Sequence, residues 1–212
     1  METATQHYYE KRGAIIIKNL RKRHFEAYYC ATKEDALTQA LALIPQGSSV
    51  GWGGATSAKQ IGLLDAVRAG SYNAVDRDKA KTPEEKVQIM HDCLSTDYFI
   101  TGANALSIDG QMVNIDRVGN RVGAIIYGPK NVLVIAGMNK VCDTIEDAVT
   151  RTRTVASPMN QQRFLGKTPC SETGICANCI SEDCLCNQIT VTRNCYPTGR
   201  IKFILVGEDL GF

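Results

Sequence analysis

The sequence has no long apolar run and little net charge. No segment approaches the roughly 20 apolar residues needed to span a bilayer, and the opening METATQHYYEKR has no apolar stretch typical of a signal peptide. The net charge is +2, and the one dense basic run, KNLRKRH at 18–24, closes a predicted helix, where cations complement the helix dipole. We therefore expect a cytoplasmic protein that binds neither nucleic acid nor a membrane.

Low-complexity tracts and internal repeats are also missing. The chain has 212 residues, of which 44% are hydrophobic and 22% are charged. These values are typical of a globular domain that buries its own core without disulfides. We therefore expect a single domain over 1–212. In a reducing compartment its cysteines are expected to remain thiols unless a metal or a reaction occupies them.

Apolar patterns and capping signals divide the chain into alternating strands and helices. Thr32 and Thr82 are typical helix N-caps, Pro83 suits a first helical turn, and Asp109-Gly110 suits a two-residue hairpin turn. Such alternation predicts an α/β fold with an open, Rossmann-like, mostly parallel sheet and helices on both faces. The predicted helices are 4–23, 32–44, 56–70, 82–94, 118–127 and 143–156, and the predicted strands are 25–30, 48–54, 72–76, 98–102, 131–137 and 201–210, with a hairpin over 105–115.

Three loops at predicted strand ends combine glycine with polar side chains. Ligands of open α/β sheets bind at the carboxyl ends of strands, where glycine permits close approach and helix N-termini attract anions. The first loop is neither GxGxxG nor a P-loop, so no nicotinamide or flavin site is indicated. We predict a small anionic metabolite as the ligand. The candidate binding residues are Gly51, Gly53, Gly54, Thr56, Ser57, Gly102, Asn104, Asn114, Asn120, Arg121, Asn139 and Lys140.

Several of these motifs resemble a known family. The segment TGANALSIDGQMVNIDRVGNRVGAIIYGPKNVLVIAG at 101–137, the loop GWGGATS at 51–57 and the ending VGEDLGF resemble the LUD (lactate utilisation, formerly DUF162) family. The resemblance implies a fold of the NagB/RpiA/CoA-transferase type. It also implies a link to iron–sulfur partner proteins, with which some members oxidise lactate to pyruvate. Homodimers are common among such domains, so a homodimer is one expected assembly.

No catalytic acid or base carries over from the wider superfamily. Isomerases of this fold have GAD followed by NK, whereas the matching positions here include Asn104, whose amide cannot titrate. Asp109 and Asp116 are the remaining candidates, although an Asp-Gly pair is more often a turn than a catalyst. No obvious CoA-transferase glutamate is present. The sequence therefore predicts a ligand pocket without an assigned catalyst.

Six cysteines lie between 170 and 195, at positions 170, 176, 179, 184, 186 and 195. Thiolates suit Zn²⁺ or an iron–sulfur cluster, but disulfides, redox-sensing thiols and idle cysteines are alternatives. The segment precedes the last predicted strand, which indicates an excursion from the domain. The cysteine-bearing LUD pattern PCxxTGxCxxCxSxxxxCN implies that Cys184 and Cys195 are spare. It implies these ligands: Cys170, Cys176, Cys179 and Cys186.

Three functions are consistent with this sequence. The first is an accessory or subunit protein of lactate or 2-hydroxyacid oxidation, with an anion at the glycine loops and a metal or iron–sulfur cluster at the cysteines. The second is a stand-alone isomerase-like or transferase-like enzyme acting on a phosphorylated or CoA-linked metabolite. The third is a non-catalytic binding or regulatory protein stabilised by zinc. Metal analysis with an absorption spectrum distinguishes the cysteine hypotheses.

Overall fold

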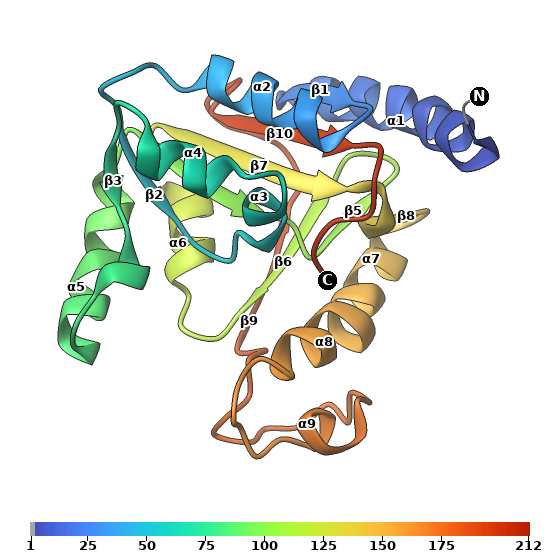
Figure 1. Ribbon diagram of the computed structural model, residues 1–212. Coiled ribbons are helices and arrows are strands. Elements are labelled where there is room, and N and C mark those ends of the chain that lie inside the picture. Colours follow the sequence, from blue (N-terminus) through green and yellow to red (C-terminus); the bar gives the residue numbers. More distant parts are fainter. Residues whose placement is uncertain (1–2) are drawn as a thin grey trace.

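The computed structural model describes residues 3–212 and has a six-stranded, fully parallel sheet at its centre (Figure 1). The strands are short and largely buried because both faces of the sheet are covered. The α/β prediction of a mostly parallel sheet is therefore confirmed. In spatial order the strands are β1 (Glu26–Cys30), β10 (Ile201–Val206), β7 (Asn131–Gly137), β4 (Tyr98–Gly102), β2 (Ser49–Trp52) and β3 (Asn73–Val75).

Two apolar clusters pack the helices onto the two faces of this sheet. Leu133 and Ile135 of β7 contact one cluster, and Val132 and Val134 contact the other, because successive side chains of a strand point to opposite faces. Ile16 of α1 is fully buried, and burying such a side chain contributes about 1.5–3 kcal/mol. The first face carries α2 (Lys33–Leu43), α3 (Thr56–Gln60) and α4 (Leu63–Ala69), and the second carries α1 (Ala4–Lys22) and α6 (Asn120–Tyr127).

A second sheet lies beside the first and was only partly predicted. The predicted hairpin is present as β5 (Ala105–Ser107) and β6 (Met112–Asp116). Its loop is longer than two residues, because Ser107 N bonds Gln111 O and Gly110 takes a left-handed φ of 89°. The edge strands β8 (Val141–Cys142) and β9 (Gln188–Thr192) complete this sheet. Neither edge strand was predicted, since both are short and half-exposed.

Two predicted helices are interrupted in the structure. The helix expected over 56–70 breaks at Gly62, whose φ of 79° lies outside the helical region. The helix expected over 143–156 forms α7 (Ile145–Arg151), passes through a π-helical turn at Thr152–Ala156 and continues as α8 (Ser157–Gln161). A π-helical turn inside an α-helix is often a functional feature. Between β3 and β4, α5 (Pro83–Asp92) begins at the predicted Thr82 cap.

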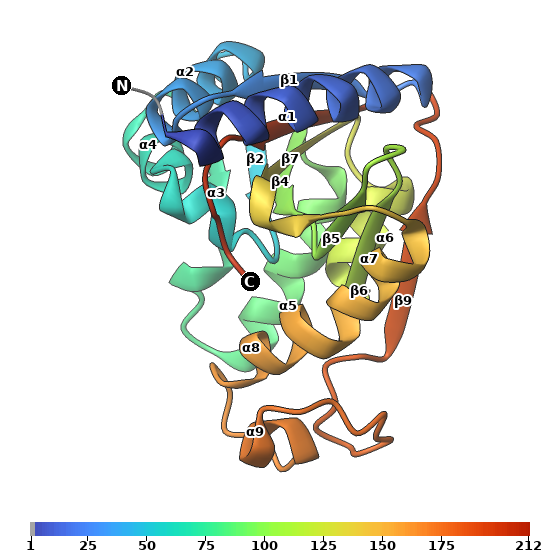
Figure 2. The same cartoon turned by 90° about the vertical axis from the view of Figure 1, so that its right-hand side faces the viewer.

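The cysteine-rich residues 162–187 connect α8 to β9 and contain the short helix α9 (Pro169–Thr173). In both views this segment lies at the end of the molecule remote from α1 (Figures 1 and 2). Thr168 caps α9 by accepting a hydrogen bond from Ser171 N at 3.2 Å. Across residues 3–212, no helix is both long enough and apolar enough to cross a membrane.

Candidate functional site

A cavity of about 330 Å³ opens at the carboxyl ends of β2, β4 and β7. We call it the anion pocket, for the charge of its lining. Gly54 follows β2, Asn104 follows β4 and Lys140 follows β7, which is where ligands of open α/β sheets bind. The turn after β6 supplies one wall, and α5, α8 and the C-terminal Phe212 supply others. The loops that the sequence analysis selected therefore meet around one cavity.

The lining of the anion pocket is strongly cationic. Among residues 3–212, Asp116 is its one acidic side chain. An excess of like charge around a partly buried cavity is costly unless an anion compensates it. The six cationic side chains that line the pocket are Arg77, Lys86, Arg117, Arg121, Lys140 and Arg163.

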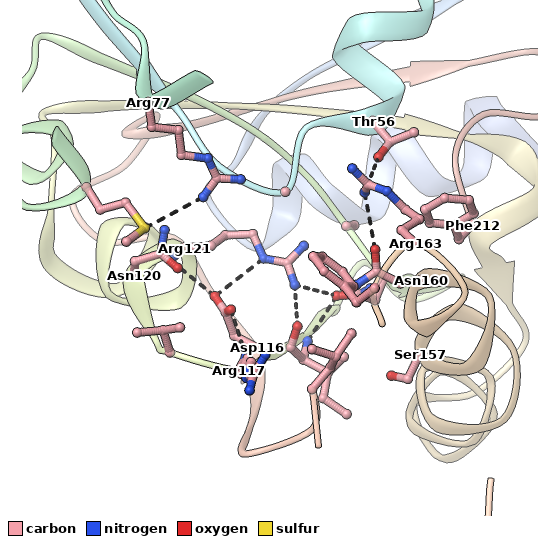
Figure 3. A pocket seen from close by; sticks show the side chains of 18 of the residues that line it. Thr56, Arg77, Asp116, Arg117, Asn120, Arg121, Ser157, Asn160, Arg163 and Phe212 are labelled. Carbon is pink, nitrogen blue, oxygen red and sulfur yellow. Dashed lines mark hydrogen bonds and ion pairs between the residues drawn. The ribbon is translucent and has the colours of Figure 1, made fainter. Parts of the chain in front are cut away.

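Arg121 contacts Asn104 and Asp116, and Figure 3 shows it beside Asp116. Its Nη2 donates to Asn104 Oδ1 at 2.9 Å and to the carbonyl of Ile115, while Nε lies 3.7 Å from Asp116 Oδ2. Burial lowers the pKa of the Arg121 guanidinium, and the neighbouring Asp116 opposes this shift. Both side chains are thus fixed in place before any ligand binds.

Asp116 is also committed to the N-terminus of α6. Its Oδ2 accepts hydrogen bonds from the backbone N–H groups of Arg121 at 3.1 Å and Val122 at 3.2 Å. A carboxylate that accepts both of these backbone hydrogen bonds stabilises the start of the helix that it caps. This position favours a structural role for Asp116.

Lys140 lies at the base of the anion pocket and has no carboxylate partner within residues 3–212. Its Nζ donates to Ser57 Oγ at 3.0 Å and to Ala103 O at 2.9 Å. Burial, together with the positive charges of Arg151 and Arg121, lowers the pKa of Lys140 to about 7. The residue is 4% exposed. Its amine therefore titrates near neutral pH.

Arg163 forms the outer rim of the pocket with two aromatic rings. Its guanidinium carbon lies 5.8 Å from the ring centroids of Phe164 and Phe212, within cation–π range. Nη1 also lies 3.2 Å from Asn160 Oδ1 and 3.5 Å from Thr56 Oγ1 (Figure 3). Four lining cations were not predicted from the sequence. Arg77, Lys86 and Arg163 lie outside the glycine loops, and Arg117 lies in the loop at 101–121 without a recognisable motif.

The predicted ligand residues divide into those that line the pocket and those that support it. Asn114 Nδ2 donates to Gly102 O at 3.0 Å from within β6, and Asn139 Oδ1 accepts from Leu210 N at 3.0 Å. A side chain at Gly51 would collide with Cys93. Of the predicted set, these line the cavity: Gly54, Thr56, Asn104, Asn120, Arg121 and Lys140. Six others, namely Gly51, Gly53, Ser57, Gly102, Asn114 and Asn139, do not line it.

Asp109, the second candidate acid, lies in the hairpin loop and does not line the anion pocket. Its Oδ2 forms a 2.5 Å ion pair with Arg23, the residue directly after α1, and accepts from Gln111 Nε2 at 3.0 Å, and its Oδ1 accepts from Ser107. These bonds lock the loop against α1. Asp109 therefore has a structural role in the hairpin loop.

A second cavity, of about 180 Å³, is lined by five cysteines, and we call it the cysteine pocket. Its thiols belong to Cys170, Cys176, Cys179, Cys184 and Cys186. They include the four predicted metal ligands and also Cys184, which the sequence analysis treated as spare. Cys195 lies instead in the core, where its Sγ accepts a hydrogen bond from Ile201 N at 3.2 Å.

The thiols of the cysteine pocket have different environments. Burial raises the pKa of Cys186 to about 11, whereas hydrogen bonds from Ser181 lower the pKa of Cys179. All nine cysteines are free thiols. Within residues 3–212, His, Cys, Asp and Glu side chains form no ready-made group of three or more metal ligands. Binding a metal in the cysteine pocket therefore requires its thiols to converge.

Two features bear on what the cysteine pocket can hold. Gln161 lines it, is 1% exposed, and has an Nε2 amide without a hydrogen-bond partner among the described residues. Such a donor suits a thiolate or a sulfide acceptor. Ser157 and Leu185 line both cavities, so the two pockets share a wall. The soft donor set fits a thiolate-bound metal centre.

Comparisons with known proteins identify the family. The family model for the LUD domain matches residues 14–206, so the chain belongs to the LUD family, which is associated with lactate utilisation. Among solved structures, that of a DUF162 family protein from Deinococcus radiodurans is similar, with a TM-score of 0.53 and 10% identity over 93% of this chain and 97% of that one. At this identity the likeness shows the fold. No curated protein matches the chain.

Proposed function

We propose that this LUD protein is an accessory or subunit protein of lactate or other 2-hydroxyacid oxidation. Its anion pocket would bind a small carboxylate metabolite. The observation that carries the proposal is the set of five cationic side chains other than Lys140 around one acidic side chain, since Asp116 already caps α6. The cavity of about 330 Å³ lies at the small end of metabolite sites, which span roughly 300–1,000 Å³.

The second part of the proposal is a metal centre in the cysteine pocket, either an iron–sulfur cluster or zinc. Five thiols and the unpaired Gln161 amide support it. A cluster would supply electron transfer beside the anion pocket, across the wall made by Ser157 and Leu185. Iron–sulfur proteins would be the expected partners for electron transfer. Zinc would instead tie residues 162–187 together and stabilise the fold.

Anaerobic purification followed by metal analysis and an absorption spectrum tests the metal centre. An iron–sulfur cluster gives a brown protein absorbing near about 400 nm, and zinc gives a colourless one. Cys176→Ser should abolish stoichiometric metal, while the matched control Cys142→Ser, outside the cysteine pocket, should keep it. Protein without bound metal under these conditions would refute the metal centre. Zinc without turnover would favour a regulatory protein.

Calorimetric titration with lactate and with pyruvate tests the anion pocket. We expect Arg77→Gln to weaken binding about tenfold, since a hydrogen bond to a charged group contributes about 1.5–3 kcal/mol. The control is Lys79→Gln, an exposed cation in the same short helix that does not line the pocket. Equal losses in both variants would show that the overall charge, and not the pocket, attracts the ligand. Binding of a phosphorylated or CoA-linked metabolite alone would favour the enzyme alternative.

A further inference from the structure

Lys140 differs from the other cations of the anion pocket because it is deeply buried and lacks a counter-charge. The two charges that contribute to its lowered pKa, those of Arg151 and Arg121, are both positive. If the only role of Lys140 were to attract an anion, desolvation would weaken that role by favouring the neutral amine. A desolvated lysine near other cations is instead the usual arrangement of an amine nucleophile.

The hydrogen bonds of Lys140 leave one position on its nitrogen without a protein partner. A neutral amine carries two N–H bonds and a lone pair. The two N–H groups donate hydrogen bonds to Ser57 Oγ at 3.0 Å and to Ala103 O at 2.9 Å. Lys140 lines the anion pocket, so its side chain borders the space in which the ligand would lie. The two hydrogen bonds hold the nitrogen in place and leave its lone pair without a partner among the described residues.

Backbone atoms of Gly211 cover the Lys140 nitrogen. A Cβ placed at Gly211 would lie 2.9 Å from both Lys140 Nζ and Ser57 Oγ, and Gly211 has a φ of 63° that favours glycine. The C-terminal residues therefore shield the Lys140–Ser57 pair from solvent. Shielding keeps the amine neutral and limits competing water.

We propose that Lys140 forms an imine with the carbonyl carbon of a 2-oxo acid held in the anion pocket. The inference rests on the proposed function, because oxidation of a 2-hydroxyacid yields a 2-oxo acid. The guanidinium groups of Arg77 and Arg163 on the pocket wall are the available partners for its carboxylate.

The reaction is a condensation without any change of oxidation state. The nitrogen lone pair attacks the carbonyl carbon, and the carbonyl oxygen takes up a proton to give a carbinolamine. The carbon–oxygen bond then breaks, the oxygen takes up the one remaining proton of the nitrogen and leaves as water, and the C=N bond forms. The Ser57 hydroxyl, in contact with Nζ, can pass protons between nitrogen and oxygen.

Borohydride trapping tests this proposal. The full-length protein is incubated with pyruvate, reduced with sodium cyanoborohydride, and analysed by intact mass and peptide mapping. We expect one adduct per chain, on Lys140. The adduct should disappear in Lys140→Met and remain in Lys59→Met, which removes an exposed lysine from α3. Mapping of the wild-type adduct decides the site even if Lys140→Met fails to fold.

The kinetics of trapping test the role assigned to Ser57. Ser57→Ala should slow adduct formation on the order of a hundredfold, the usual contribution of a positioned proton-transfer group. Pyruvate affinity, measured by calorimetry, should change less than the trapping rate. Equal losses of affinity and rate would show that Ser57 only holds Lys140 in position, and would overturn its assignment as the proton relay.

The outcomes separate this inference from the proposed function. Pyruvate that binds without forming an adduct, or that modifies several surface lysines equally, overturns the imine and leaves the binding proposal standing. An adduct on Lys140 in a protein without metal supports the imine and overturns the metal centre. If pyruvate gives no heat of binding and no adduct, both the imine and the carboxylate pocket are overturned.

Discussion

Replacing Lys140 by Met should change how the stability of the protein depends on pH. Burial lowers the pKa of Lys140 from 10.5 to about 7. Between these values the unfolded lysine carries a proton that the folded one lacks, so raising the pH favours the folded state. Relative to Lys140→Met, the free energy of unfolding of the wild type should increase by about 1.4 kcal/mol for each full pH unit of this window. From pH 7 to pH 9 the increase should be about 2 kcal/mol.

Urea unfolding of both proteins at several pH values measures this difference. Groups common to the two proteins cancel in the comparison, so the remaining slope belongs to Lys140. The variant also loses the hydrogen bonds to Ser57 and Ala103. Their loss shifts its free energy of unfolding by the same amount at every pH and does not change the slope against pH. The exposed-site control Lys59→Met should run parallel to the wild type. A Lys140→Met curve that is also parallel would refute the argument that the amine is buried and neutral.

Three further predictions concern stability and metal content. Arg68→Ala should destabilise the protein by about 3 kcal/mol in urea unfolding because it leaves the Asp76 carboxylate buried without its 2.8 Å partner. Asp65→Ala removes only the exposed pair at 2.9 Å and should cost less than about 1 kcal/mol, so equal effects would contradict the distinction. Gly211→Ala should lower the free energy of unfolding by about 1–2 kcal/mol, and an unchanged value would show that the C-terminal residues are not held over the pocket. Cys195→Ala should cost about 1–3 kcal/mol yet keep the full metal content, and metal loss would place Cys195 among the ligands.

The prediction of the fold rested on local signals that the structure keeps. Thr32 and Thr82 cap the helices that they were expected to cap, and the apolar runs form the six parallel strands. The failures occur where local signals are weak or where glycine overrides them. Gly62 breaks a helix whose apolar pattern continues on either side, and β9 has the half-exposed pattern of an edge strand among turn residues.

The candidate site was predicted in part for the same reason. Glycine loops at strand ends are visible in a sequence, so Asn104, Arg121 and Lys140 were selected before their cavity was known. Arg77 lies in a short helix and Arg163 in the turn that follows α8, and the orientation of both depends on packing. No local pattern distinguishes them from solvated surface cations. Cys184 reaches the cysteine pocket through the path of residues 162–187, which spacing alone does not determine.

By itself the amino-acid sequence determined the alternation of strands and helices, the glycine loops and the clustering of thiols, because these follow from backbone preferences and side-chain chemistry over short distances. Only the tertiary structure decided which cations surround one cavity, why Asp109 lies elsewhere, and that Lys140 loses its solvent. Burial and charge proximity depend on segments far apart in the chain. The chemistry of the pocket therefore arises from packing, since the same lysine in the unfolded chain would be an ordinary hydrated ammonium.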